Sequence, residues 1–276
     1  MQQALRRLTE PDPLDDFSPR RIDIDGIART VHVAGCGPAV IVMPEMPGIG
    51  PHLARFARWV RDAGFTVWMP SLFGRDGALP DAEEAIATFR HTCVGAQFRA
   101  LATEQPSPIA LWLRGLARNA HAECGGPGVG AIGMCFTGNF ALSMMLEPAV
   151  LAPVLCQPSM PLEDAAALES PPAVLAAVRQ RLEREDLSVL AWRFAGDRFC
   201  TAQRFAAYAA ALGERFDGRV LPDAAANRAD LPPFFEHVIK GPHSVVTVHL
   251  VDAAGEPTLA ARDAILAFLA RRLKQA

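Results

Sequence analysis

Short apolar runs that alternate with amphipathic stretches most constrain how this chain can fold. Residues 39–43 read AVIVM, a turn rich in glycine and proline follows, and residues 52–62 then repeat apolar side chains at helical spacing. A continuous apolar run is typical of a strand that is buried on both faces of a sheet. Because the same unit recurs along the chain, the sequence predicts an α/β fold, with a mainly parallel sheet covered by helices on both faces.

The expected elements follow from these patterns. Residues 21–33 alternate around Asp25-Gly26 and predict a hairpin, which makes the sheet mixed at its start. Further strands are expected at 65–69, 128–132, 150–156, 187–194 and 219–221, and helices at 81–103, 107–123, 139–146, 171–185, 201–212 and 258–272. Neither a repeat nor a linker divides the 276 residues, so we expect one domain over 1–276 with an irregular arm at 1–20.

Composition excludes several classes of protein. A net charge of −3 provides no basic field for nucleic acid or an anionic membrane. No apolar stretch reaches the ~18 uncharged residues of a membrane helix, and the N-terminus lacks the apolar segment of a signal peptide. The six cysteines show neither a CxxC pair nor a Cys/His metal spacing. We therefore expect a cytoplasmic protein that binds a small molecule and uses neither a metal nor another cofactor. The oligomeric state is left open.

A cysteine stands where a predicted buried strand runs into a helix. Residues 129–138 read VGAIGMCFTG, which resembles the nucleophile-elbow pattern G-x-S-x-G with Cys135 in place of serine. The sharp turn lifts the side chain above the sheet, and the helix N-terminus below it favours a thiolate. Thr137 departs from the pattern, because the second glycine comes one position later, at Gly138. Taken alone, a cysteine with apolar neighbours is more often a packing residue than a nucleophile.

Candidates for an acid and a base follow Cys135 in the chain order that an elbow requires, which is nucleophile, acid, histidine. Asp197 turns off the end of a predicted strand, although an ordinary turn or cap aspartate would have the same pattern. His243 stands in a loop directly before an apolar run and is the preferred base. His237 lies between proline and phenylalanine residues, and His249 lies within the apolar run, so both fit less well.

Glu45 ends the first buried strand, where an unpaired carboxylate would be costly. One interpretation is that it caps a turn amide or pairs with an arginine such as Arg75. The other is that it faces the active site, because the turn after this strand supplies the second oxyanion donor. In that case Glu45 would be a gatekeeper, which keeps the resting Cys135 neutral by like-charge repulsion and accepts its S–H hydrogen bond.

Together these residues resemble the dienelactone hydrolase family. The shared motifs, in order over about residues 22–272, are Glu45-Met46-Pro47-Gly48, Pro70-Ser71-Leu72 followed by Arg75, Gly133-Met134-Cys135, Gly196-Asp197 and Pro242-His243-Ser244. The resemblance implies an α/β-hydrolase fold with Cys135 as nucleophile, His243 as base, Asp197 orienting it and Glu45 contacting the resting thiol. It also implies an oxyanion hole made by the backbone N–H groups of Met46 and Phe136, and substrate contacts from Arg75 and Phe199.

The implied activity is that of a carboxylic ester hydrolase, similar to a carboxymethylenebutenolidase, which works through an acyl-cysteine on an ester or lactone. Because a thiolate leaves more readily than an alkoxide, this chemistry favours enol lactones, aryl esters and thioesters. Family members that act on dienelactone hold its carboxylate with an arginine just past the histidine, whereas residues 244–248 here contain no basic residue. Segments at about 80–125 and 222–240 look enlarged and are expected to shape the pocket mouth. The alternative is a non-catalytic or redox-sensitive protein of the same fold, acting as a binding or regulatory module.

Overall fold

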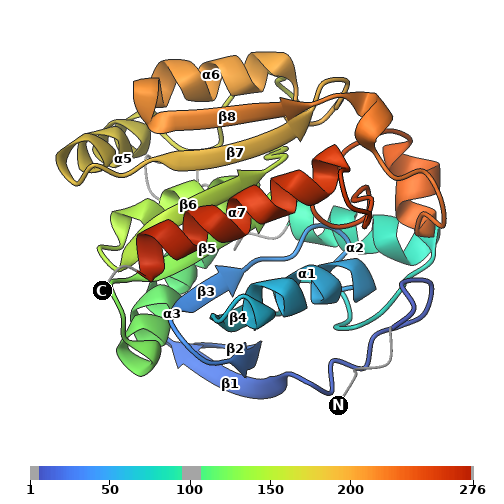
Figure 1. Cartoon of the computed structure of the whole chain (residues 1–276), viewed down its shortest axis with the longest axis horizontal. Coiled ribbons are helices and arrows are strands. Elements are labelled where there is room, and N and C mark those ends of the chain that lie inside the picture. The colour runs from blue at the N-terminus through green and yellow to red at the C-terminus, as the bar shows by residue number, and fades with distance from the viewer. Residues whose placement is uncertain (1–5, 95–106, 275–276) are drawn as a thin grey trace.

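The strands pair into one eight-stranded sheet with the order β1-β2-β4-β3-β5-β6-β7-β8 (Figure 1). The computed structural model describes residues 6–94 and 107–274. The strands are β1 (Ser18–Ile24), β2 (Ile27–Gly35), β3 (Ala39–Val42), β4 (Thr66–Pro70), β5 (Val129–Met134), β6 (Val150–Cys156), β7 (Val189–Phe194) and β8 (Phe216–Leu221). β1 and β2 form the predicted hairpin, β2 runs antiparallel to β4, and every later pair is parallel.

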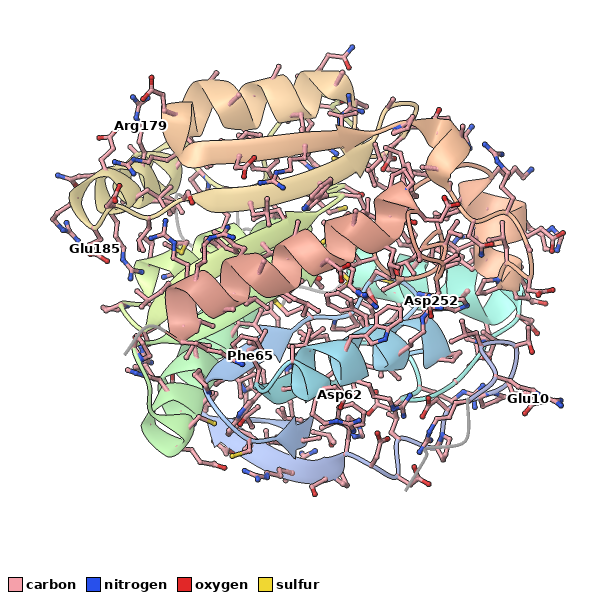
Figure 2. The ribbon with its side chains drawn as sticks, in the orientation of Figure 1. Glu10, Asp62, Phe65, Arg179, Glu185 and Asp252 are labelled. Carbon is pink, nitrogen blue, oxygen red and sulfur yellow. The ribbon has the colours of Figure 1, made fainter. Side chains whose placement is uncertain are left out.

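Helices cover both faces of the sheet, and the side chains of β3 show how the layers form. Val40 and Val42 point toward α1 (Pro51–Asp62) and α7 (Pro257–Leu273), while Ile41 packs in the opposite layer. That second layer contains α3 (Pro108–Cys124), α4 (Gly138–Ser143), α5 (Pro172–Arg184), α6 (Ala202–Leu212) and part of α2 (Ala82–Val94). Figure 2 shows charged side chains such as Arg179 of α5 and Glu185, the residue directly after α5, on the outside of these layers. The predicted α/β architecture, mainly parallel and covered on both faces, is confirmed.

Some predicted boundaries differ from the observed ones. β8 is longer than predicted because it is an edge strand, where charged side chains such as Asp217 and Arg219 face solvent and interrupt the apolar signal. The helix expected at 139–146 is α-helical only as far as Ser143, and a 3₁₀ turn follows at Met144–Leu146. Of the helix expected at 81–103, the part after Val94 lies outside the described residues.

Of the expected N-terminal arm at 1–20, residues 6–17 form neither helix nor strand, and β1 already begins at Ser18. Two carboxylates of the arm bind one arginine of α1: Arg58 donates to Asp12 at 2.6 and 2.8 Å and to Asp16 at 2.7 and 2.8 Å. The backbone N–H of Asp12 also donates to the carbonyl of Gly77 at 2.8 Å. The arm, which carries Glu10 in Figure 2, is thus fixed both to α1 and to the loop after β4.

No helix in the described part of the chain is long and apolar enough to cross a membrane.

Candidate active site

Cys135 lies at the junction that the sequence pattern predicted. It directly follows β5, and its φ of 52° lies in the left-handed region, which a residue with a side chain rarely adopts. The backbone N–H of Ser159 donates to the Cys135 carbonyl at 3.1 Å, and this holds the turn from the β6 side. Strain of this kind persists only where the surroundings impose it, and it presents the half-buried thiol at the carboxyl edge of the sheet.

Thr137, the departure from the elbow pattern, has a structural role of its own. Its hydroxyl donates to the carbonyl of Pro44 at 3.0 Å and accepts from the backbone N–H of Met134 at 3.0 Å, so it ties the elbow to the end of β3. The glycine is needed one position later, because a Cβ on Gly138 would lie 2.6 Å from the Cα of Pro158. The shifted glycine therefore follows from how closely α4 approaches the segment after β6.

Asp197 and His243 form a buried pair. Oδ2 of Asp197 lies 2.8 Å from Nδ1 of His243, and 0% and 1% of the two side chains are exposed. Oδ1 of Asp197 accepts from the backbone N–H groups of Phe199 at 2.9 Å and Cys200 at 3.0 Å. With Oδ1 occupied in this way, Oδ2 is fixed against Nδ1, which keeps the proton on Nδ1 and leaves Nε2 as the basic nitrogen.

Cys135 also affects the protonation of His243. Burial by itself lowers the pKa of His243, but Asp197 and Cys135 outweigh burial and raise this pKa well above its ordinary value. The sulfur is thus close enough to act on the ring, although Nε2 makes no well-aligned hydrogen bond within residues 6–94 and 107–274. Loose alignment is common in catalytic sites that hold no substrate.

Two side chains that the sequence did not single out as partners hold the loop of His243. Nδ1 of His249 accepts from the backbone N–H groups of His243 at 3.3 Å and Ser244 at 3.0 Å. The buried Gln157, which follows β6, accepts from the backbone N–H of Val245 at 3.2 Å. Burial lowers the pKa of His249 to about 3, so its ring stays neutral and can accept at Nδ1.

The turn that carries Asp197 is also fixed by charged neighbours. Asp223, just after β8, accepts from the backbone N–H of Gly196 at 2.8 Å. Arg193 of β7 donates to the carbonyl of Phe194 at 2.7 Å and to the carbonyl of Ala195 at 3.0 Å. The aspartate is therefore held by the sheet rather than by a flexible loop.

Glu45 is buried, and its hydrogen bonds lead to the loop of His243. Its carboxyl accepts from the hydroxyls of Ser244 and Thr247 and from the side-chain amide of Gln157 at 3.2 Å. Burial raises the pKa of Glu45 above its ordinary value, while these hydrogen bonds and the nearby His243 act in the opposite direction. The suggested pairing with Arg75 is wrong, because the guanidinium of Arg75 binds another carboxylate.

The residues expected to form the oxyanion hole belong to two segments, the elbow and the turn after β3. Phe136 directly follows Cys135, and Met46 lies in the turn after β3, where the N–H of Gly48 donates to the carbonyl of Glu45 at 2.8 Å. Gly48 has a φ of 145°, and a Cβ there would lie 2.7 Å from the carbonyl oxygen of Phe73. The E-x-x-G motif is thus a tight turn against the loop after β4.

Phe199, expected to contact a substrate, contacts the base. Its ring meets that of His243 edge to face, with 5.5 Å between centroids. The ring is half-buried, so Phe199 covers part of the imidazole and still reaches the surface of the site.

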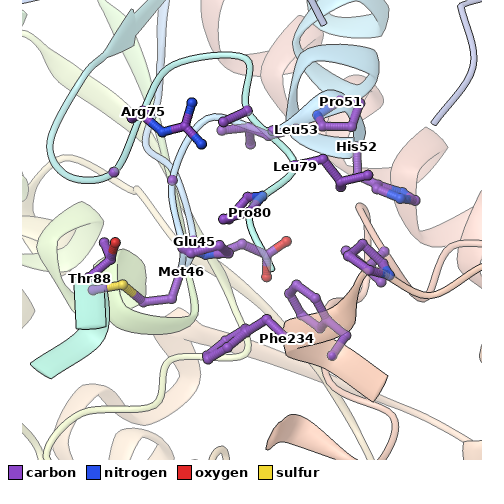
Figure 3. Close-up of a pocket in the computed structure, with 18 of the residues that line it drawn as sticks. Glu45, Met46, Pro51, His52, Leu53, Arg75, Leu79, Pro80, Thr88 and Phe234 are labelled. Carbon is purple, nitrogen blue, oxygen red and sulfur yellow. The ribbon is translucent and has the colours of Figure 1, made fainter. Parts of the chain in front are cut away.

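A cavity with about 590 Å³ of empty space, partly open to solvent, adjoins Glu45 and Met46 (Figure 3). Cys135 is not part of its lining, which comes from the turn after β3, the loop at 74–80, α2 and residues 232–235. Arg75 lines it, and its guanidinium binds Glu84 through two bonds of 2.7 and 2.9 Å. His52 also lines it, and burial lowers the pKa of His52 to about 4, so this ring is neutral at pH 7.

Known proteins resemble this chain both in sequence and in fold. The sequence profile of the dienelactone hydrolase family matches residues 24–181, more than half of the chain. The chain belongs to the dienelactone hydrolase family. This membership makes it a dienelactone hydrolase-like esterase or hydrolase, whereas no curated protein matches its sequence.

Solved structures confirm the α/β-hydrolase fold of this dienelactone hydrolase family member. A dienelactone hydrolase-like promiscuous phosphotriesterase from metagenomic libraries is 21% identical, with a TM-score of 0.60 over 94% of this chain and 99% of that one. A provisionally assigned dienelactone hydrolase from Klebsiella pneumoniae subsp. pneumoniae is 15% identical, with a TM-score of 0.58 over 91% and 98%. A cold-adapted esterase from an Arctic intertidal metagenomic library is 13% identical, with a TM-score of 0.58 over 92% and 93%. At these identities the likeness establishes the fold.

Within residues 6–94 and 107–274, no group of three or more His, Cys, Asp and Glu side chains is placed so that it could hold a metal ion.

Proposed function

We propose that this family member hydrolyses carboxylic esters through an acyl-cysteine on Cys135. The observation that carries the proposal is the buried Asp197–His243 pair, whose remaining nitrogen is left for the strained Cys135. Nε2 of His243 takes the thiol proton, and the sulfur attacks the ester carbonyl carbon. The N–H groups of Met46 and Phe136 then bind the oxyanion.

The intermediate collapses as the carbon–oxygen or carbon–sulfur bond to the leaving group breaks, and His243 returns its proton to that group. A water molecule next loses a proton to His243 and attacks the acyl carbon, which releases the acid and regenerates the thiol. Because the thiolate itself is a good leaving group, the first intermediate reverts to the thiolate and the intact ester unless the leaving group of the substrate departs as readily. The proposed substrates are therefore enol lactones, aryl esters and acyl thioesters.

The cavity supports an ester without a carboxylate. The guanidinium of Arg75 is already paired with Glu84, His52 is neutral, and the segment after His243 contains no basic residue. Among the described residues that line the cavity, no cation without a partner would offset the carboxyl of Glu45 for an anionic substrate such as dienelactone. A specificity like that of carboxymethylenebutenolidase is therefore not proposed for this chain.

The function is tested by a hydrolysis screen of enol lactones, aryl esters and acyl thioesters. Each is assayed as a neutral and a carboxylate-bearing member of the same scaffold, with wild type and Cys135→Ala. Turnover that depends on Cys135 and is faster for the neutral member supports the proposal. Equal rates in the two proteins contradict it.

Glu84→Gln should widen the specificity. The change frees the guanidinium of Arg75 at the cavity wall, so kcat/KM for carboxylate-bearing esters should rise by about threefold to tenfold, while neutral esters are unaffected. Glu83→Gln, which removes the same charge from an exposed neighbour outside the cavity, is the matched control. A similar gain in both variants would assign the effect to net charge and not to Arg75.

Glu45→Gln tests the gatekeeper role, which remains a proposal. Glu45 lies close enough to His243 to affect the pKa of that ring. If the carboxylate also repels the Cys135 thiolate, as the gatekeeper role requires, its removal should lower the pH midpoint of Cys135 alkylation by about one unit. Turnover should fall as well, while glutamine keeps the shape and much of the hydrogen bonding. Identical alkylation profiles together with a lower melting temperature would leave Glu45 as an anchor of the His243 loop only.

A further inference from the structure

A second cavity lies on the other side of the loop that carries His243. It contains about 680 Å³ of empty space, open to solvent, and its walls come from residues 226–228, 231, 235–236, 240–242 and His249. In Figure 1 this region is the orange segment between β8 and α7. Phe235 lines both cavities and separates them. The proposed hydrolysis uses no group of this second cavity.

His249 presents a hydrogen-bond donor to this cavity. Its ring is 2% exposed, and Nδ1 already accepts two backbone N–H groups, from His243 and Ser244. A neutral imidazole that accepts at Nδ1 must carry its proton on Nε2. Within the described residues no protein atom accepts a hydrogen bond from Nε2, so this N–H is left to face the solvent-open cavity.

Two cations line the same cavity. Arg228 makes one long bond of 3.4 Å, to the carbonyl of Asp223, and neither Arg228 nor Lys240 forms an ion pair within the part of the chain described. Burial is the main cause of the low pKa of His249, and the charge of Arg228 contributes to it, which places Arg228 near the ring. Glu236 supplies one carboxylate to the lining, so the cations prevail.

We infer that this cavity is a binding site for a small oxyanion, a carboxylate or a phosphate, held by Nε2–H of His249, Arg228 and Lys240. Charge-assisted hydrogen bonds from a guanidinium and an ammonium suit such an anion, and Nε2–H of His249 supplies a third donor. An anion on Nε2–H also polarises the ring and strengthens Nδ1 as acceptor for the His243 loop. An anion bound in this cavity would therefore stabilise the loop that carries His243, whatever reaction His243 serves.

The experiment measures the melting temperature of the full chain with phosphate, succinate or chloride at constant ionic strength. Phosphate, succinate or both should raise the melting temperature of wild type above its value in chloride. Arg228→Gln combined with Lys240→Gln should weaken that binding by about tenfold or more. Arg90→Gln combined with Arg271→Gln removes the same charge from exposed positions on α2 and α7 and should leave the binding unchanged.

Side-chain nitrogen NMR of His249 provides the second measurement. The spectrum should show the Nε2–H tautomer, and the Nε2 signal should move on addition of the anion that stabilises the protein. A response to phosphate alone or to succinate alone identifies the oxyanion. No stabilisation of wild type, equal stabilisation in all three proteins, or an unmoved His249 signal would each overturn the inference.

Discussion

Cys135→Ala is expected to lower kcat/KM for an activated aryl ester by at least about 10³-fold and to leave the fold intact. The thiol is half-buried at a turn whose strain comes from the backbone, so its removal takes away the attacking atom and little packing. The measurement combines ester turnover with a melting curve. Cys135→Ser should also be weak, because a hydroxyl needs a stronger base than this site offers to a thiol.

Cys124→Ala is the control for Cys135→Ala, because Cys124 is a half-buried free thiol on α3, away from the elbow. It should keep wild-type turnover. Iodoacetamide should inactivate wild type through Cys135 alone. Undiminished turnover in Cys135→Ala would refute the covalent mechanism and favour a binding or redox role for this fold.

Asp197→Asn is expected to lower turnover by about 10³- to 10⁴-fold, because it moves the proton of the His243 ring from one nitrogen to the other. The backbone N–H groups of Phe199 and Cys200 require an acceptor, so the amide oxygen must take the place of Oδ1. The amide nitrogen then faces Nδ1 of His243 as a donor, which forces the ring proton to Nε2. An imidazole in that tautomer cannot accept the thiol proton.

Asp223→Asn is the matched control for Asp197→Asn. It removes an equal charge from the neighbouring turn and keeps an oxygen for the N–H of Gly196, so most activity should remain. A tenth or more of wild-type turnover in Asp197→Asn, with a normal melting temperature, would show that Asp197 does not set the tautomer of His243.

The sequence alone was sufficient to predict the helices and strands that bury apolar side chains. The runs that became β3, β5 and β6 are buried on both faces, and a buried strand leaves a continuous apolar signal. Motif order placed Asp197 and His243 correctly as neighbours, although only Asp197 closely follows a parallel strand, β7, whereas His243 lies in a loop well beyond β8. What these residues do there stays a prediction.

The supporting residues could not be predicted in the same way, because their partners lie far away in sequence. Gln157 acts on a loop 88 residues later, and Asp223 holds a turn 27 residues earlier. Both follow the ends of parallel strands, which is the one sequence signal that would have found them. His249 was set aside as a base because it lies in an apolar run, and that same burial makes it a neutral acceptor for the His243 loop.

The contacts of Arg58 have a practical consequence for anyone who edits the start of this chain. If the first 16 residues were removed to tidy an expression plasmid, a nearly buried guanidinium would lose both of its carboxylates. An unpaired charge in that position typically costs about 3–5 kcal/mol, a large share of the stability of an ordinary domain. The loop holding Gly77 and Arg75 would lose its tether at the same time. Purification tags on this protein therefore belong ahead of the intact arm or at the opposite terminus.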